Sequence, residues 1–412
     1  MKIGYACTPI TTNARTNRKL LLKDFSYEKF CEITKKNLDD LEKILKWNIK
    51  NNIYLFRISS DIIPLGSHEI NNIKWEEIFK ERLNSLGKII CNNNLRVSMH
   101  PGQYTVLNSP NEDVLRKSIR DLEYHCKFLD SLNLDYKNKI IIHIGGVYGN
   151  KPLATKNFLK GFNLLSSFLK RRLVIENDEK NFSLDDVLYI SNKINIPVIF
   201  DNLHNLCYGD NKYSLREIYS KVSKSWNYEI DGPIKVHYSQ QDLLKKKGSH
   251  SPTIEVKSFL DYYETIKDFS PDIMLEVKDK DISAIKCINA IKELNKELTP
   301  FKIKEEKENY EILFKEYFES FNENPSILHK SLREYYFSLD KALLCKKKHK
   351  NLSLSIPLAK EELKPYINSR ENTYLEKLIS KGELLKAKSY IKKLVKRIEF
   401  PKKKLSYYIS QY

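Results

Sequence analysis

The sequence predicts an α/β protein that folds as a (β/α)8 TIM barrel and carries an additional basic, mainly helical C-terminal module. Eight short apolar runs rich in β-branched residues alternate with longer segments of helical period over roughly 300 residues. A (β/α)8 barrel usually needs about 250 residues, so this part of the chain has the right length for one. Beyond about residue 300 the pattern changes to helical faces interspersed with basic clusters.

The eight apolar runs are the predicted strands, at residues 2–6, 53–59, 95–99, 139–144, 172–176, 197–201, 234–238 and 273–277. The segments between them carry apolar residues at three- to four-residue spacing, the period of an amphipathic helix, most clearly at 30–50, 111–132 and 283–298. An open doubly wound sheet is the alternative. Because no glycine-rich dinucleotide loop follows the first run, we favour the barrel and expect no nucleotide cofactor.

Composition favours a cytoplasmic protein that binds a polyanion. No stretch of about 18 apolar residues occurs, and the amino terminus MKIGYACTPI does not have the pattern of a signal peptide. The seven cysteines are scattered, which indicates reduced thiols rather than a disulfide framework. The formal charge of +18 favours a nucleic-acid partner over a membrane, because a basic surface attracts and holds a phosphate backbone.

The C-terminal part of the chain is the most basic. Residues 301–412 hold 25 Lys plus Arg against 15 Asp plus Glu, a net +10 of the total +18. The basic clusters lie at 345–350, 392–397 and 401–404. We therefore expect two domains, a barrel at 1–300 and an extension at 301–412 that binds a nucleic-acid duplex, braces the barrel or only forms a solvated surface.

Residues able to bind metal or transfer protons gather at the predicted strand ends, where a TIM barrel has its active site. Five of the nine histidines and three carboxylates lie there: His100, His143, His204, His237 and His250, with Glu176, Asp201 and Glu276. Lys235 precedes His237 by two positions. Since residues two apart in a strand face the same side, both side chains should point into the barrel.

Each of these residues has a simpler interpretation when taken alone. A single carboxylate at a strand end can be a helix cap or an ion-pair partner, and a single histidine can be a hydrogen-bonded core residue. A closed barrel, however, aims all of them at one small volume, where they would repel or stay unsatisfied without cations. Imidazole with carboxylate suits zinc, manganese or iron, whereas magnesium prefers oxygen alone. Eight ligands exceed the need of one ion, so we expect two or three.

Six stretches of the sequence together resemble the UV DNA damage endonuclease family, which has a TIM barrel related to endonuclease IV. They are SMHPGQYTVLNSP (98–110), IHIGGVYG (142–149), LVIENDE (173–179), DNLHN (201–205), KVHYS (235–239) and GSHS (248–251). The resemblance covers about residues 1–300 and rests on the whole set. It implies an enzyme that nicks DNA immediately 5′ to UV photoproducts, and at other distorting lesions or abasic sites, leaving a 3′-hydroxyl.

The resemblance also implies a cluster of up to three divalent ions, most often Mn²⁺, with Zn²⁺ or Mg²⁺ as alternatives. Three ligand sets are implied: His100, His143 and Glu176; then Glu176 again with Asp201, His237 and Glu276; then His204 and His250. In the endonuclease IV pattern an aspartate lies two residues before the last histidine, where this chain has Gly248. The third set is therefore expected to be the weakest.

Four further residues take roles from the resemblance. Lys235 is carboxylated in the family and would act beside Glu176 and Glu276 in catalysis. Gln103 and Tyr104 insert into the duplex at the lesion, and Tyr5 is expected to line the same pocket. By composition alone, PGQY (101–104) is only a turn, and Lys235 could be a counter-ion of the carboxylates.

Three other functions fit part of the pattern. An abasic-site endonuclease uses the same barrel and metals and differs in the loops that read DNA. A sugar isomerase barrel combines the same side chains with divalent metal but needs neither a basic tail nor the PGQY loop. A non-enzymatic DNA-binding protein would explain the charge and not the ligands at the strand ends. Metal-assisted hydrolysis of a phosphodiester accounts for both.

Overall fold

The barrel predicted from the sequence is the observed fold. The computed structural model describes residues 1–210, 212–317, 331–344 and 351–410. Eight parallel strands close into a barrel in chain order. They are β1 (Ile3–Ala6), β2 (Leu55–Ile58), β3 (Arg96–Met99), β4 (Lys139–His143), β5 (Leu173–Glu176), β6 (Val198–Asp201), β7 (Lys235–Tyr238) and β8 (Asp272–Leu275). Each predicted strand is present, and its ends differ from the prediction by no more than about two residues.

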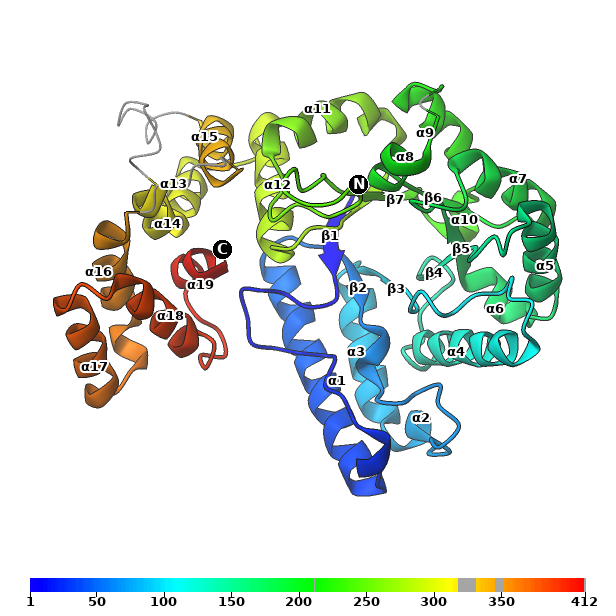
Figure 1. Ribbon diagram of the computed structural model, residues 1–412, viewed down its shortest axis with the longest axis horizontal. Helices are drawn as coiled ribbons and strands as arrows, with labels where there is room; N and C mark the ends of the chain where they lie inside the picture. The colour runs from blue at the N-terminus through cyan, green and yellow to red at the C-terminus, as the bar shows by residue number, and fades with distance from the viewer. Residues whose placement is uncertain (211, 318–330, 345–350, 411–412) are drawn as a thin grey trace. The chain divides into compact units, whose positions relative to one another are not determined.

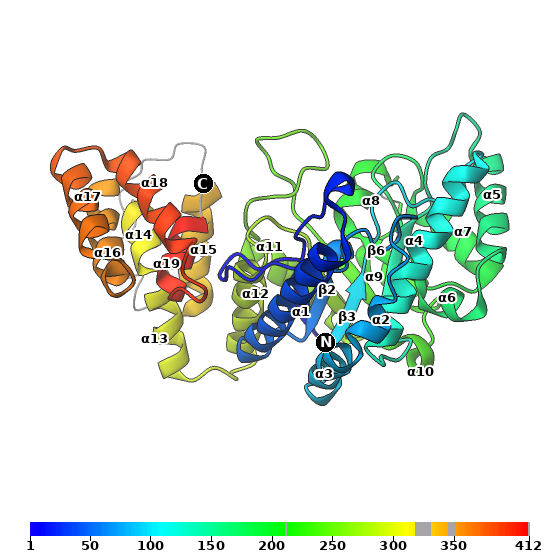
Figure 2. The same ribbon diagram turned by 90° about the horizontal axis from the view of Figure 1, so that it is seen from below.

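Helices surround the strands as the outer layer of the barrel (Figures 1 and 2). They are α1 (Tyr27–Lys50), α2 (Trp75–Ile78), α3 (Lys80–Asn92), α4 (Glu112–Ser131), α5 (Lys151–Asn163), α6 (Ser167–Arg172), α7 (Leu184–Ile194), α8 (Asn202–Tyr208), α9 (Leu215–Ser223) and α10 (Tyr228–Asp231). Capping residues set where the helices begin: Ser26 accepts the Lys29 N–H, so α1 begins at Tyr27, three residues before the predicted start. No helix in the described ranges is both long and apolar enough to span a membrane.

The interior of the barrel holds both apolar and charged side chains. Ile141, Val174 and Ile199 form a small apolar cluster on neighbouring strands β4 to β6. At the amino ends of β3 and β8, the Arg96 guanidinium contacts the Asp272 carboxylate at 3.0 Å. Both side chains are buried, so the barrel interior holds a positive and a negative charge that balance each other at this end.

Replacing Asp272 by alanine should lower the free energy of unfolding by about 3–5 kcal/mol, because Arg96 would keep a buried charge without its partner. Equilibrium denaturation with guanidinium chloride measures the change. The matched control is Glu69→Ala, which breaks exposed ion pairs with Arg116 and Arg120 and should change the free energy of unfolding far less. Equal losses in the two variants would contradict the expectation.

Close packing divides the described chain into two compact units. The first comprises residues 1–8, 15–251 and 263–276, and the second comprises 9–14, 252–262 and 277–412. Helix α11 (Val256–Ile266) has residues in both. The predicted boundary at residue 300 stays a prediction, because the second unit also takes in segments from the amino-terminal two thirds of the chain.

Where the structure describes it, the C-terminal part of the second unit is mainly helical, as the sequence predicts. Its helices are α12 (Asp281–Leu294), α13 (Pro300–Asn309), α14 (Glu311–Tyr317), α15 (Leu332–Leu344), α16 (Leu352–Leu363), α17 (Ser369–Ser380), α18 (Leu384–Val395) and α19 (Lys403–Ser410). A core of its own, which includes Ile356, Leu375 and Ile391, holds α16 to α19 together. The predicted basic cluster at 345–350 lies outside the described residues.

Candidate metal centre

Two groups of three side chains meet at the carboxyl ends of the strands. The first is His100, His143 and Glu176, and the second is Glu176, Asp201 and His237; in each group the candidate ligand atoms lie within 4.8 Å of one another. Strand register produces this, since His143 pairs with Glu176 and Asp201 with His237 on neighbouring strands. Glu176 belongs to both groups and is therefore the residue that can link two ions.

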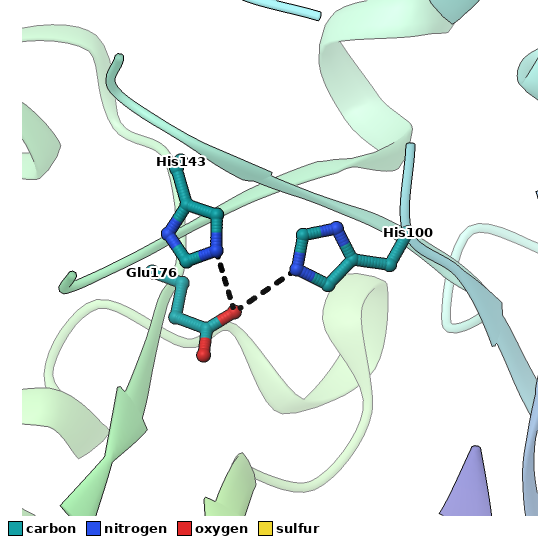
Figure 3. A group of neighbouring side chains, drawn as sticks. All are labelled: His100, His143 and Glu176. Carbon is teal, nitrogen blue, oxygen red and sulfur yellow. Dashed lines mark ion pairs between the residues drawn. The ribbon is translucent and has the colours of Figure 1, made fainter. Parts of the chain in front are cut away.

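The first group points both imidazoles at one carboxylate oxygen (Figure 3). Glu176 Oε2 lies 3.4 Å from His100 Nε2 and 3.9 Å from His143 Nε2. The His100 Nδ1–H donates to the Pro101 carbonyl at 3.1 Å, which leaves the Nε2 lone pair directed at the carboxylate. A fixed tautomer of this kind is typical of metal-binding histidines.

Several buried polar atoms in the centre make no hydrogen bond within the described protein: Glu176 Oε2, Asp201 Oδ2 and His143 Nδ1. Burial lowers the pKa of His143 to about 4, so its ring is neutral and able to bind a cation at neutral pH. Burial raises the pKa of Asp201 to about 7, which shows that a carboxylate charge is costly there without a cation. These residues fit divalent ions that accept imidazole and carboxylate ligands.

Glu276 follows β8 and is held by Arg57, a residue that the sequence analysis missed. The Arg57 Nη2 donates to Glu276 Oε1 at 2.5 Å and to His237 Nε2 at 3.0 Å. With Nε2 accepting from Arg57, the Nδ1–H of His237 donates to Glu176 Oε1 at 2.8 Å, so His237 would bind an ion only in place of one of these two hydrogen bonds. An arginine inside the apolar run of β2 is the sequence signal that could have indicated an inward-facing charge.

His204 and His250 border the two groups without belonging to either. The Asp201 carboxylate accepts the His204 N–H at 2.8 Å and so caps helix α8, and the His204 ring donates from Nδ1 to the Asn177 carbonyl at 3.0 Å. His250 Nε2 lies 3.8 Å from Glu276 Oε2. Within the described residues, no group of three joins these two histidines, and the predicted third ion site stays a prediction.

Lys235 points into the lumen, as strand alternation predicts, but it is not the counter-ion of the carboxylates. Its Nζ donates to Ser98 Oγ at 2.5 Å, and the side chain is buried. Burial, together with the charges of Arg57 and Arg96, lowers the pKa of Lys235 well below its ordinary value. Arg57, and not Lys235, is the cation that pairs with Glu276.

A cleft of about 450 Å³ opens beside the first group, and its lining includes His100, Gln103, Tyr104, His143 and Tyr148. Gln103 is exposed, and Tyr104 is 74% exposed, which is unusual for an aromatic side chain at the mouth of a cleft. The loop after β3 thus presents both residues to a molecule bound over the metal centre.

Tyr5 does not line this cleft, contrary to expectation. The side chain is completely buried, and its hydroxyl donates to Asn48 Oδ1 in α1 at 2.8 Å. Strand alternation gives the reason. Ala6 pairs with Arg57, whose side chain lies in the lumen, so the preceding Tyr5 faces outward and packs edge-on against Phe56.

The fold and the site define a class of protein, a (β/α)8 barrel whose carboxyl end carries histidine and carboxylate groups suited to divalent metal. Comparison with known proteins is more specific. The family described as UV-endonuclease UvdE matches residues 2–307. The UV DNA damage endonuclease of Clostridium perfringens (strain 13 / Type A) is 67% identical over 411 residues, which is 100% of each chain.

Two other relatives match the barrel part of the chain. The UV DNA damage endonuclease of Bacillus cereus (strain Q1) is 32% identical over 304 residues, covering 71% of this chain and 94% of its own. The crystal structure of SacUVDE superposes with a TM-score of 0.68 at 40% identity, covering 72% of this chain and 99% of that one. The chain belongs to the UV-endonuclease UvdE family.

Proposed function

We propose that this protein is a DNA repair endonuclease that nicks the damaged strand immediately 5′ to UV photoproducts, and at other distorting lesions or abasic sites. The observation that carries the proposal is the pair of ligand groups joined by Glu176, next to a cleft with Gln103 and Tyr104 exposed at its rim. Membership of the UvdE family and 67% sequence identity with the Clostridium perfringens enzyme support the same reaction.

The proposed ligands are those of the two groups, together with Glu276, His204 and His250, for two to three ions. Mn²⁺ is the proposed metal, with Zn²⁺ or Mg²⁺ as alternatives. Divalent ions there would supply Lewis-acid stabilisation of a phosphodiester and an acidified water. Arg57 holds Glu276 in place by a charged hydrogen bond, and the buried Asp201 keeps its carboxylate directed into the centre.

The reaction can be tested on a labelled duplex that carries a single photoproduct, incubated with Mn²⁺. A nick directly 5′ to the photoproduct with a 3′-hydroxyl end is expected, and EDTA should abolish it. A matched duplex with an abasic site distinguishes an enzyme that acts only on abasic DNA, and an undamaged duplex is the control. Cutting of the abasic duplex alone would contradict the proposed preference for photoproducts.

Gln103 and Tyr104 are proposed to enter the duplex and fill the space left by the displaced lesion. Replacing both by alanine should raise KM for the damaged duplex about tenfold or more, because stacking on an aromatic ring contributes about 1–3 kcal/mol per base. Steady-state cleavage of a damaged duplex measures this. Tyr189→Ala, at an exposed tyrosine on α7, is the control. Unchanged cleavage by the Gln103 and Tyr104 double variant would disprove the insertion.

Carboxylation of Lys235 is proposed from the family resemblance, and two observations support it. The amine is buried, and its pKa is lowered, so the neutral form that can add carbon dioxide and release a proton is favoured. Native mass spectrometry in bicarbonate buffer should detect the added mass of one carbon dioxide in the wild type and not in Lys235→Arg. An unmodified lysine in protein that cleaves DNA at full rate would refute the assignment.

A further inference from the structure

The loop after β7 presents two adjacent leucines to solvent. Leu243 is 87% exposed and Leu244 is 63% exposed. The next three residues, Lys245 to Lys247, are also exposed. Single exposed apolar residues are common on soluble proteins, but here an adjacent exposed pair is followed directly by three lysines, which suits contact with a partner that offers both apolar surface and negative charge.

Backbone hydrogen bonds close this loop at its base. At its base, Gln241 and His250 form an antiparallel bridge. The Asp242 N–H donates to the Ser249 carbonyl at 2.7 Å. At the tip, the Asp242 carboxylate accepts the Leu244 N–H at 3.1 Å. A loop closed in this way loses little conformational entropy when its tip binds a partner.

The base of the loop borders the candidate metal centre. His250 ends the bridge and lies 3.8 Å from Glu276. The Lys247 ammonium donates to the Cys207 carbonyl of α8, the helix that carries His204, at 2.9 Å. In a closed ring of eight strands β7 lies opposite β3. The leucine loop and the loop of Gln103 and Tyr104 therefore flank the metal centre from opposite sides.

We propose that Leu243 and Leu244 wedge into a base step beside the lesion while Lys245 and Lys246 contact the flanking phosphates. This rests on the proposed DNA endonuclease function and adds a second set of duplex contacts to it. Leucine side chains inserted from the minor groove partly unstack a base step and bend the duplex. The lysines next to the leucines favour a polyanionic partner over a protein surface, because they place positive charge at the rim of the apolar contact.

The first test distinguishes insertion of the leucines into the duplex from electrostatic attraction to DNA alone. The chain carries Glu176→Gln so that bound duplex is not cut, and 2-aminopurine is placed in the base step beside the lesion. Binding should raise its fluorescence because the base unstacks. In Leu243→Ser with Leu244→Ser, at least half of that increase should disappear and Kd should rise about tenfold, with the salt dependence of binding unchanged.

Two further variants complete the test. Lys245→Ala with Lys246→Ala should keep the fluorescence increase and lower the slope of log Kd against log salt by about 0.9 for each phosphate that is no longer neutralised. Leu164→Ser, at a 65% exposed leucine after the end of α5, should behave as the parent chain. Helix α5 leads away from the carboxyl end of β4, so Leu164 lies on the opposite end of the barrel.

Unchanged fluorescence and Kd in the leucine double variant would overturn the proposal. The proposal would also be overturned if the leucine double variant bound DNA normally but lost a self-association that the wild type shows in sedimentation experiments. That result would assign the leucines to contact with a second copy of the chain. Cleavage by the wild-type chain is measured in parallel. If the wild type nicks damaged DNA and the leucine variant binds normally, only this inference fails; if the wild type nicks none, the endonuclease function itself fails.

Discussion

Replacing Glu176 by glutamine should reduce kcat/KM for cleavage of a damaged duplex by at least about 10³-fold, or about 4 kcal/mol of transition-state stabilisation. Glutamine has nearly the same volume, so the change removes charge and leaves packing intact. Glu176 is shared by both ligand groups, and its Oε2 has no hydrogen-bond partner among the described residues. Loss of this one carboxylate should therefore weaken the binding of two ions at once.

Two measurements distinguish this cause from unfolding. Isothermal titration with Mn²⁺ should show weaker binding in Glu176→Gln, while the midpoint of thermal unfolding without added metal changes little. His100→Ala removes a ligand of the first group alone and should leave the second group able to bind an ion. Glu69→Gln, at an exposed carboxylate, is the control for loss of charge. A loss of less than tenfold in Glu176→Gln would argue against a bridging role.

The positions of the strands could be predicted because the physics that fixes them is local. A strand of a closed parallel barrel is buried on both faces, so it reads as a short continuous apolar run, such as residues 140–142 within β4. The same runs stop at polar residues where the strand reaches the mouth, as IPVIFDNLHN (196–205) does at Asp201 and His204. Glu176 and Asp201 end β5 and β6, so the candidate ligands were found with the strands.

What could not be predicted depends on side-chain direction and on contacts distant in sequence. The prediction that Tyr5 lines the cleft rests on the family resemblance, and it is wrong because strand alternation turns this side chain outward toward α1. Arg57 was missed because its partner Glu276 is 219 residues away, and only the barrel register brings the two together. No local sequence pattern predicts that residues 9–14 and 252–262 pack with the C-terminal helices either.

Asp201 and His204 should differ sharply when they are replaced, although they are only three residues apart. Asp201 is completely buried and belongs to the second ligand group, whereas His204 stands in neither group. Asp201→Asn should reduce cleavage by at least about 10²-fold at every Mn²⁺ concentration. His204→Ala should cost about tenfold at limiting Mn²⁺ and recover in part as Mn²⁺ is raised, because a weaker outer ion can be restored by mass action.

The choice of asparagine at 201 separates the two roles of that side chain. Asp201 Oδ1 caps α8 by accepting the His204 N–H at 2.8 Å, and asparagine is an equally good cap, so helix and fold should be preserved. Asp201→Ala loses the cap as well and should unfold about 1 kcal/mol more easily than Asp201→Asn. Equal rescue of Asp201→Asn and His204→Ala by Mn²⁺ would mean that both residues bind the same weaker outer ion. It would contradict the expectation that Asp201 binds a tighter central ion. If Asp201→Asn loses cleavage completely and keeps normal stability, then the buried charge, and not the helix cap, is the reason this strand ends on aspartate.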